Sequence, residues 1–188
     1  MSMVFETERL IVRRFRREDA ADIVAFAGDP SVAAEILNVP WQDPIKLFEY
    51  IEVQHGLALF AAQECVDLAI ERKSDRKAIG LLSFVSNGQR QGEIGWALGV
   101  EHRGSGYAAE AVRGLISFAF EICGYHRVFA GTILTNERSW KLMERVGMRK
   151  EAHFREAHVP AEPGGPWIDS VRYAVLASEW PDHAALSD

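Results

Sequence analysis

Arg103-Gly104-Ser105-Gly106-Tyr107-Ala108 is a glycine-rich turn that separates an apolar run from a helical pattern. The run before it, residues 93–100, predicts a strand. After it, apolar residues recur at helical spacing and predict an amphipathic helix over 109–123. The first amides of a helix have no partners inside it, and the helix dipole favours negative charge there. The sequence therefore predicts that this turn binds a phosphorylated ligand.

The turn fits two phosphate-binding patterns. Gly104, Gly106 and Ala109 form G-x-G-x-x-A, the fingerprint of dinucleotide-binding folds. Arg103, Gly106 and Ala108 form R-x-x-G-x-A. A dinucleotide fold begins with a strand–helix–strand unit and has an acidic residue about 20 residues further on. Here hairpin patterns precede the turn, and the next apolar run has an acidic residue only beyond its end. The second pattern is therefore favoured.

Size and composition indicate one globular domain over residues 1–188, with 48% hydrophobic and 26% charged residues. The net charge of −6 argues against nucleic-acid binding. Cys65 and Cys123 lie in apolar sequence and are expected in the core, and no Cys/His cluster has zinc spacing, so no metal is expected. Early charged residues exclude a signal peptide, and no apolar run is long enough to span a membrane. We therefore expect a cytoplasmic protein with no membrane partner.

The hydrophobic periodicity predicts an α+β fold with the order β-α-α-β-β-β-α-β-α-β-β. This order combines a meander with one parallel crossover. The expected strands are 7–15, 66–71, 78–85, 93–100, 127–134, 148–158 and 168–176. The expected helices are 18–26, 44 to about 62, 109–123 and 136–146.

The R-x-x-G-x-A turn resembles the pyrophosphate-binding motif of the Gcn5-related N-acetyltransferase (GNAT) superfamily, whose element order is similar to this one over nearly the whole chain. Four pieces resemble its Rim-type subgroup, which acetylates N-terminal amines of ribosomal proteins and other amines. They are T-E-R-L at 7–10, E-I-G-W at 93–96 with G-S-G-Y-A-A-E-A at 104–111, N-E-R-S at 136–139 with G-M at 147–148, and R-E at 155–156 with W-I-D at 167–169. Met148 stands where the subgroup has Phe.

The resemblance implies a mixed, mostly antiparallel seven-stranded sheet flanked by helices, with two splayed parallel strands at its centre. It also implies acetyl-CoA as cosubstrate and, as a common habit of the family, a homodimer. The pantetheine arm would enter the gap between the parallel strands and bond Leu98 and Val100. The pyrophosphate would lie on the amides of Arg103, Gly104, Ser105, Gly106, Tyr107 and Ala108.

Direct transfer to an amine requires a base for the ammonium, a donor for the oxyanion and a proton for the departing thiolate. By resemblance, Ser139 would lie near the sulfur and supply that proton. Alternatively, its hydroxyl only satisfies its own helix. Asn136 is expected to cap the helix and to contact the cofactor.

Two residues are candidates for the base. Glu93 begins the strand that lines the cleft, so rigid structure would set its distance to the thioester. His158 falls where some Rim-type enzymes have a glutamate proposed as base, and imidazole titrates in a suitable range. His158 borders the glycine- and proline-rich segment 160–166, which suggests poor positional control. Glu93 is therefore narrowly favoured.

The acceptor site is the least determined part of the sequence. Trp41 could form a wall of the amine site or belong to the core, and Tyr173 could point into the cleft or into the core. A protein N-terminus, a polyamine or another small amine would each present the same nucleophile. A non-catalytic acyl-CoA-binding regulatory protein is the alternative function, because it would retain the turn without needing Ser139 or Glu93.

Overall fold

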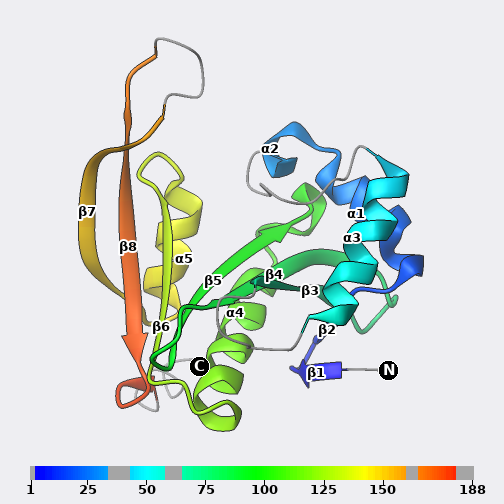
Figure 1. Ribbon diagram of the computed structural model, residues 1–188, viewed down its shortest axis with the longest axis horizontal. Coiled ribbons are helices and arrows are strands. Elements are labelled where there is room, and N and C mark those ends of the chain that lie inside the picture. Colours follow the sequence, from blue (N-terminus) through cyan, green and yellow to red (C-terminus); the bar gives the residue numbers. More distant parts are fainter. Residues whose placement is uncertain (1–2, 34–42, 58–64, 160–164, 181–188) are drawn as a thin grey trace.

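The computed structural model describes residues 3–33, 43–57, 65–159 and 165–180. In this part of the chain a single sheet has the strand order β1-β2-β3-β4-β5-β6-β8-β7 (Figure 1). The strands are β1 (Met3–Glu6), β2 (Leu10–Arg14), β3 (Cys65–Arg72), β4 (Ala78–Ser86), β5 (Gln91–Leu98), β6 (Arg127–Ile133), β7 (Arg149–His158) and β8 (Ile168–Leu176). The predicted α+β class is confirmed. The predicted count of seven strands is wrong, because Met3–Glu6 adds an eighth as a short edge strand beside β2.

The strands β5 and β6 lie near the centre of the sheet. They are the one parallel pair among the described strands. These strands pair only from Gln91 to Glu93 with Arg127 to Phe129, and beyond that point they are no longer paired. All other neighbouring strands pair antiparallel. The predicted splayed central pair is therefore confirmed. A doubly wound dinucleotide fold, which needs a mostly parallel sheet, is excluded.

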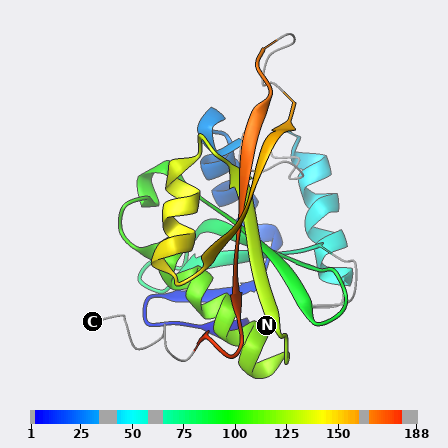
Figure 2. The ribbon, with the colours of Figure 1, turned by 90° about the vertical axis from the view of Figure 1, so that its left-hand side faces the viewer.

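Helices cover both faces of the sheet, with α5 and α3 on opposite sides in Figure 2. They are α1 (Ala20–Ala27), α2 (Pro30–Ala33), α3 (Pro44–Gly56), α4 (Tyr107–Ser117) and α5 (Glu137–Arg145). Side chains of β5 alternate between the two faces. Ile94 and Leu98 pack in the core that includes α4, whereas Ala97 packs in the core beneath α1 and α3. Each face of β5 is therefore covered by its own helical layer.

Several element boundaries differ from those predicted, and two affect the site. The strand β5 ends at Leu98, so Val100 lies in the short 3-10 turn Val100–His102. The helix α4 starts at Tyr107, directly after the glycine turn, and the chain leaves it through one π-helical turn, Phe118–Ile122. The predicted N-cap is confirmed, because the Asn136 side chain accepts a hydrogen bond from the amide of Ser139 at 3.3 Å.

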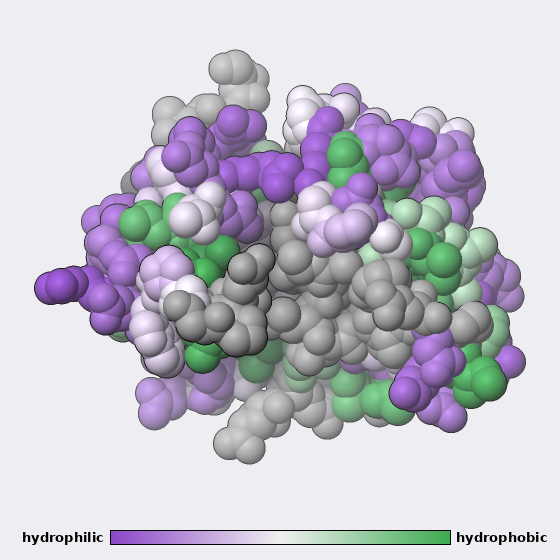
Figure 3. All heavy atoms as spheres, turned by 90° about the horizontal axis from the view of Figure 1, so that it is seen from above, coloured by the Kyte–Doolittle hydropathy of each residue, from purple (hydrophilic) through white to green (hydrophobic). Residues whose placement is uncertain are grey.

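The remaining features concern the interior and the surface. Cys65 and Cys123 are free thiols, and neither is fully buried, contrary to the core position expected for them. No helix in the described ranges is long and apolar enough to cross a membrane. In the view from above, hydrophobic residues lie scattered among hydrophilic ones (Figure 3). Some of these hydrophobic residues lie at the end of the molecule that holds α1 and α3. Val24, Ile45 and Val53 are exposed on those two helices.

Candidate active site

The turn between β5 and α4 has the backbone geometry of an anion site. Gly104 and Gly106 have φ of +79° and +82°, the left-handed region that favours glycine. Gly106 is the N-cap of α4. The amides of Tyr107 and Ala108, in the first turn of the helix, have no partners inside it. A side chain added at Gly104 would meet no atom within 4 Å, so the turn is open to solvent at Gly104.

This turn forms one wall of a cavity of about 340 Å³. Five of the six residues predicted to hold the pyrophosphate line it, and Ser105 does not. The described lining residues are Trp96, Ala97, Leu98, His102, Arg103, Gly104, Gly106, Tyr107, Ala108, Ala109, Arg138, Ser139, Lys141, Leu142 and Arg145. The Ser105 carbonyl accepts a hydrogen bond from Arg9 Nη1 at 2.9 Å, so Ser105 connects the turn to the N-terminal segment.

The opposite wall carries positive charge that the sequence analysis missed. Arg138, Lys141 and Arg145 lie on α5 and line the same cavity. Their spacing of three and four residues places them on one face of the helix, and this spacing was the available signal. Together with the α4 N-terminus, these cations give the smaller cavity a lining that suits an anion.

Arg9 is a second residue that sequence reasoning did not single out. Its Nε lies 2.6 Å from Glu110 Oε2, and its guanidinium lies 4.6 Å from the centre of the Tyr107 ring. Thr7 also donates to Glu110. Burial raises the pKa of Glu110, but hydrogen bonds from Thr7 and from the amide and guanidinium of Arg9 outweigh burial, and the pKa lies below its usual range. This network holds the start of α4 and the turn in place.

Arg103, Leu98 and Val100 lie differently from the predicted arrangement. The Arg103 Nε donates to the Leu98 carbonyl at 3.2 Å, and its Nη1 lies 3.5 Å from Ser31 Oγ on α2. The Val100 carbonyl accepts from the Arg103 amide at 3.2 Å. Because Val100 lies past the end of β5 and its carbonyl is used within the turn, it does not belong to the strand edge that was predicted to bind pantetheine. Leu98 does.

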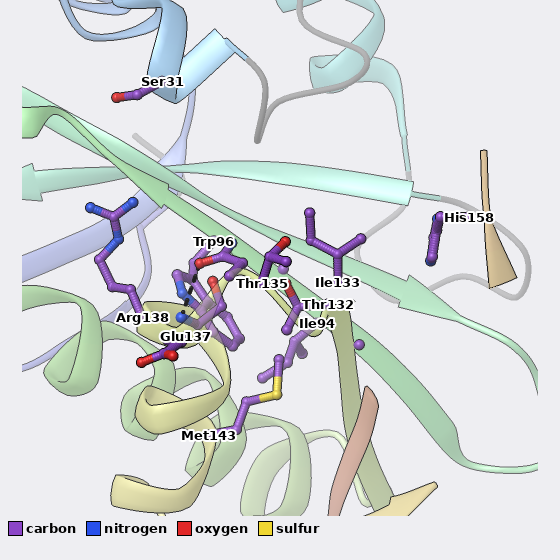
Figure 4. A pocket seen from close by; sticks show the side chains of 14 residues that line it. Ser31, Ile94, Trp96, Thr132, Ile133, Thr135, Glu137, Arg138, Met143 and His158 are labelled. Carbon is purple, nitrogen blue, oxygen red and sulfur yellow. Dashed lines mark hydrogen bonds between the residues drawn. The ribbon is translucent and has the colours of Figure 1, made fainter. Parts of the chain in front are cut away.

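A second, larger cavity of about 710 Å³ lies where β5 and β6 separate (Figure 4). It shares Trp96, Arg138 and Ser139 with the first cavity. Its described lining is Ser31, Ile94, Gly95, Trp96, Gly131, Thr132, Ile133, Thr135, Asn136, Glu137, Arg138, Ser139, Met143 and His158. The two cavities are therefore neighbours, with Trp96, Arg138 and Ser139 in the wall of both.

Hydrogen-bond register shows which backbone groups border this gap. The amide of Arg127 donates to Arg90 on the β5 side, and the amide of Leu134 donates to Asp169 on the β8 side. Since the direction alternates along a strand, the amide and carbonyl of Gly131 face β5. By the same alternation, those of Trp96 and Leu98 face β6. Trp96 is therefore a gap-facing backbone position that the sequence analysis missed.

The predicted catalytic residues occupy different places. Ser139 lines both cavities, and Asn136 lines the larger one. His158 also lines the larger cavity, at the opposite end from Arg138 in Figure 4. Glu93 is at the last paired position before the strands separate and is not among the lining residues described. The geometry brings Ser139, Asn136 and His158 into one space and leaves Glu93 at its closed end.

Of the two predicted acceptor residues, Tyr173 is the one that the structure describes, and it does not lie at either cavity. Tyr173 is 3% exposed and lines neither cavity, and its hydroxyl donates to Glu144 Oε1 at 2.9 Å. Burial and this hydrogen bond raise the pKa of Tyr173 to about 12. The core position does not support a substrate contact. Trp41 lies outside the described residues.

Comparison with known proteins identifies the family. The acetyltransferase (GNAT) domain family matches residues 9–149, and the chain belongs to this family. Bacillus subtilis YnaD, named as an uncharacterized N-acetyltransferase, is 26% identical over 95% of this chain and 99% of its own. A GNAT-family acetyltransferase structure from Bacillus anthracis has a TM-score of 0.79, with 25% identity, over 95% of this chain and all of that one. The Escherichia coli ribosomal protein uS5-alanine N-acetyltransferase is 28% identical over 46% of this chain and 43% of its own.

The protein is thus an acetyl-CoA-dependent N-acetyltransferase with the Rim-type pattern, and the non-catalytic alternative is set aside. The residues present fit acetyl-CoA. Two left-handed glycines and the first residues of α4 line the smaller cavity, and three cationic residues of α5 line it as well. Among the described residues, no group of three or more His, Cys, Asp or Glu side chains is placed to hold a metal.

Proposed function

We propose that this enzyme transfers the acetyl group directly to a singly charged primary amine, with a peptide N-terminus as the preferred acceptor. The observation that carries this proposal is the junction of the two cavities at Trp96, Arg138 and Ser139. A ligand whose phosphates lie at the α4 N-terminus can extend past Ser139 into the larger cavity. The acceptor would then approach through the larger cavity.

The charge of the larger cavity supports an acceptor with one positive charge. Glu137 is the one acidic residue among its described lining residues. Its carboxylate already lies 2.6 Å from Lys141 Nζ. A polyamine has further ammonium groups that would need carboxylates to replace their hydration. In a peptide, by contrast, the groups next to the amine are neutral amides, which can pair with the gap-facing backbone of Gly131.

Each residue has a proposed task in the transfer. The β5 edge, through the amides of Trp96 and Leu98, would hold the pantetheine arm and the thioester carbonyl. His158 would take the proton from the ammonium, and Ser139 would donate a proton to the departing thiolate. His158 is preferred to Glu93 as the base because it lines the acceptor cavity. Since it lies at the opposite end of this cavity from Arg138 (Figure 4), the proton would reach it through water.

The acceptor class is tested by comparing three substrates at equal concentration, with release of the CoA thiol as the readout. These are a short peptide with a free N-terminus, the same peptide with a blocked N-terminus, and spermidine. We expect kcat/KM to be at least about tenfold higher for the free peptide than for spermidine. A preference for spermidine would overturn the proposed acceptor class without affecting acetyl-CoA binding.

The base is tested by the pH dependence of His158→Gln and Glu93→Gln. If His158 is the base, its replacement should lower kcat/KM at neutral pH by a factor on the order of 100, with a smaller defect at high pH, where the amine is already neutral. Glu93→Gln should not show this pattern. The reverse result would assign the base to Glu93.

A further inference from the structure

The strand β7 contains a large irregularity immediately before His158. Phe154 pairs with Ser170, and His158 pairs with Ile168, so four steps along β7 match two steps along β8. A regular ladder would place Glu156 opposite Ile168. The bulge instead puts His158 at that position, about 7 Å back from where a regular strand would carry it.

This bulge has a backbone cost that other contacts must offset. Glu156 has φ of +50°, a left-handed conformation that residues other than glycine rarely adopt. Bulges of this kind are frequent next to active sites, where they redirect a side chain. The carboxylate that holds the bulge should therefore influence His158.

Asp169 on β8 is that carboxylate. Its Oδ1 accepts a hydrogen bond from the Glu156 amide at 2.8 Å, and its Oδ2 lies 2.6 Å from His153 Nε2. Its own carbonyl accepts from the Leu134 amide at 2.8 Å, just after the end of β6. Asp169 thus connects His153, before the bulge, and Glu156, within it, to the residue that follows β6.

We propose that Asp169 is a positioning residue, which holds the β7 bulge so that the His158 imidazole lies in the acceptor cavity. This inference rests on the proposed role of His158 as the base. The sequence after His158, rich in glycine and proline, suggested that His158 is poorly positioned. The contacts of Asp169 would supply the missing positional control. Asp169 itself is not among the described residues that line either cavity.

A double-mutant cycle tests the proposal in the full-length protein. Asp169→Ala should lower kcat/KM for a peptide acceptor by about tenfold to a hundredfold through displacement of His158, with the Kd for acetyl-CoA unchanged. Like His158→Gln, it should lose less activity at high pH. The double variant should be no less active than His158→Gln alone, since a positioning residue acts through the residue it positions.

Two further variants separate positioning from folding. Asp169→Asn keeps an oxygen that can accept from the Glu156 amide, so it should recover most of the activity lost in Asp169→Ala. Glu151→Ala removes the β7 carboxylate that pairs with Arg127, away from the bulge, and should retain normal kcat/KM. Unfolding temperatures of all variants are measured alongside.

The outcomes separate the positioning role of Asp169 from the role of His158 as the base, on which it rests. Normal activity in Asp169→Ala with a defective His158→Gln would overturn the positioning role alone. Normal activity in His158→Gln would overturn the role of His158 as base, and with it the reason for the bulge. Additive losses in the double variant, or a uniform defect at every pH, would show that Asp169 acts other than through His158.

Discussion

Gly106 is the residue on which we expect cofactor binding to depend most. In Gly106→Val, the new Cβ would lie 3.3 Å from the flexible end of Arg9 and would strain the backbone at φ of +82°, and the added side chain would crowd a phosphate at the amides. We expect the Kd for acetyl-CoA to rise roughly a hundredfold, measured by calorimetry. Gly88→Val is the matched control, because Gly88 has a similar φ of +77° and open space around it, and it lines neither cavity. Equal affinity in the two variants would contradict the phosphate assignment.

The chemical task proposed for Ser139 can be tested separately from its structural one. The helix cap uses the Ser139 amide and the Asn136 side chain, so Ser139→Ala leaves the cap intact and favours helix slightly. We expect kcat to fall by a factor of at least about 10, with little change in the Kd for acetyl-CoA. Where single-turnover measurements establish that chemistry limits the rate, an unchanged kcat would leave Ser139 with no role as a proton donor.

At the scale of elements, the N-terminal segment supports the start of α4. Arg9→Ala removes the ion pair to Glu110 and the hydrogen bond to the Ser105 carbonyl. We expect the Kd for acetyl-CoA to rise about fivefold to tenfold with kcat nearly unchanged, because the turn loses order but not its amides. Arg17→Ala is the control, since Arg17 also pairs with a carboxylate, Glu52, and lies over an aromatic ring. Similar affinities for the two variants would count against a role for Arg9.

The same network makes a contribution to stability that depends on pH. The pKa of Glu110 is lowered in the folded protein, so its contribution is present above the unfolded pKa of about 4.3 and is lost as pH falls through the folded pKa. The Glu110→Gln substitution removes the ionised carboxylate and should lower the free energy of unfolding at pH 7 by about 1 kcal/mol. The difference between the two proteins should shrink below about pH 4. A constant difference from pH 7 to pH 3, measured by urea denaturation, would contradict the ionised pairing.

At the scale of the whole molecule, a buried charge cluster ties the first strands to the helical layer. Glu71 is 0% exposed and contacts Arg13, Arg16 and Arg76, while Arg13 also binds both oxygens of Asp19. Glu71→Gln leaves guanidinium groups without their buried counter-charge and should cost about 3–5 kcal/mol. The unfolding temperature should fall by about 10 °C.

The control for this prediction is an ion pair at the surface. The Glu151 side chain is 43% exposed and pairs with Arg127. Glu151→Gln breaks this pair and should cost less than about 1 kcal/mol. Calorimetric melting of both variants measures the difference. Equal losses would mean that burial does not make the Glu71 cluster more important than a surface pair.

Local sequence was sufficient for the elements and for the cofactor turn. Hydrophobic periodicity, the Asn136 cap and the left-handed glycines at 104 and 106 depend on residues a few positions apart. These features predict the strands to within a few residues and predict a phosphate site at the turn, which stays a prediction. The short β1 strand escaped because four residues carry too little pattern.

Contacts between distant segments set the rest of the site. Arg9 reaches Ser105 and Glu110 across about a hundred residues of chain, and periodicity carries no information about such a pair. Tyr173 is buried away from both cavities, and the register of β7 against β8 places His158 at the larger one. The physical reason is that side-chain direction in a strand is local, whereas the partner that holds it depends on how the strands are paired.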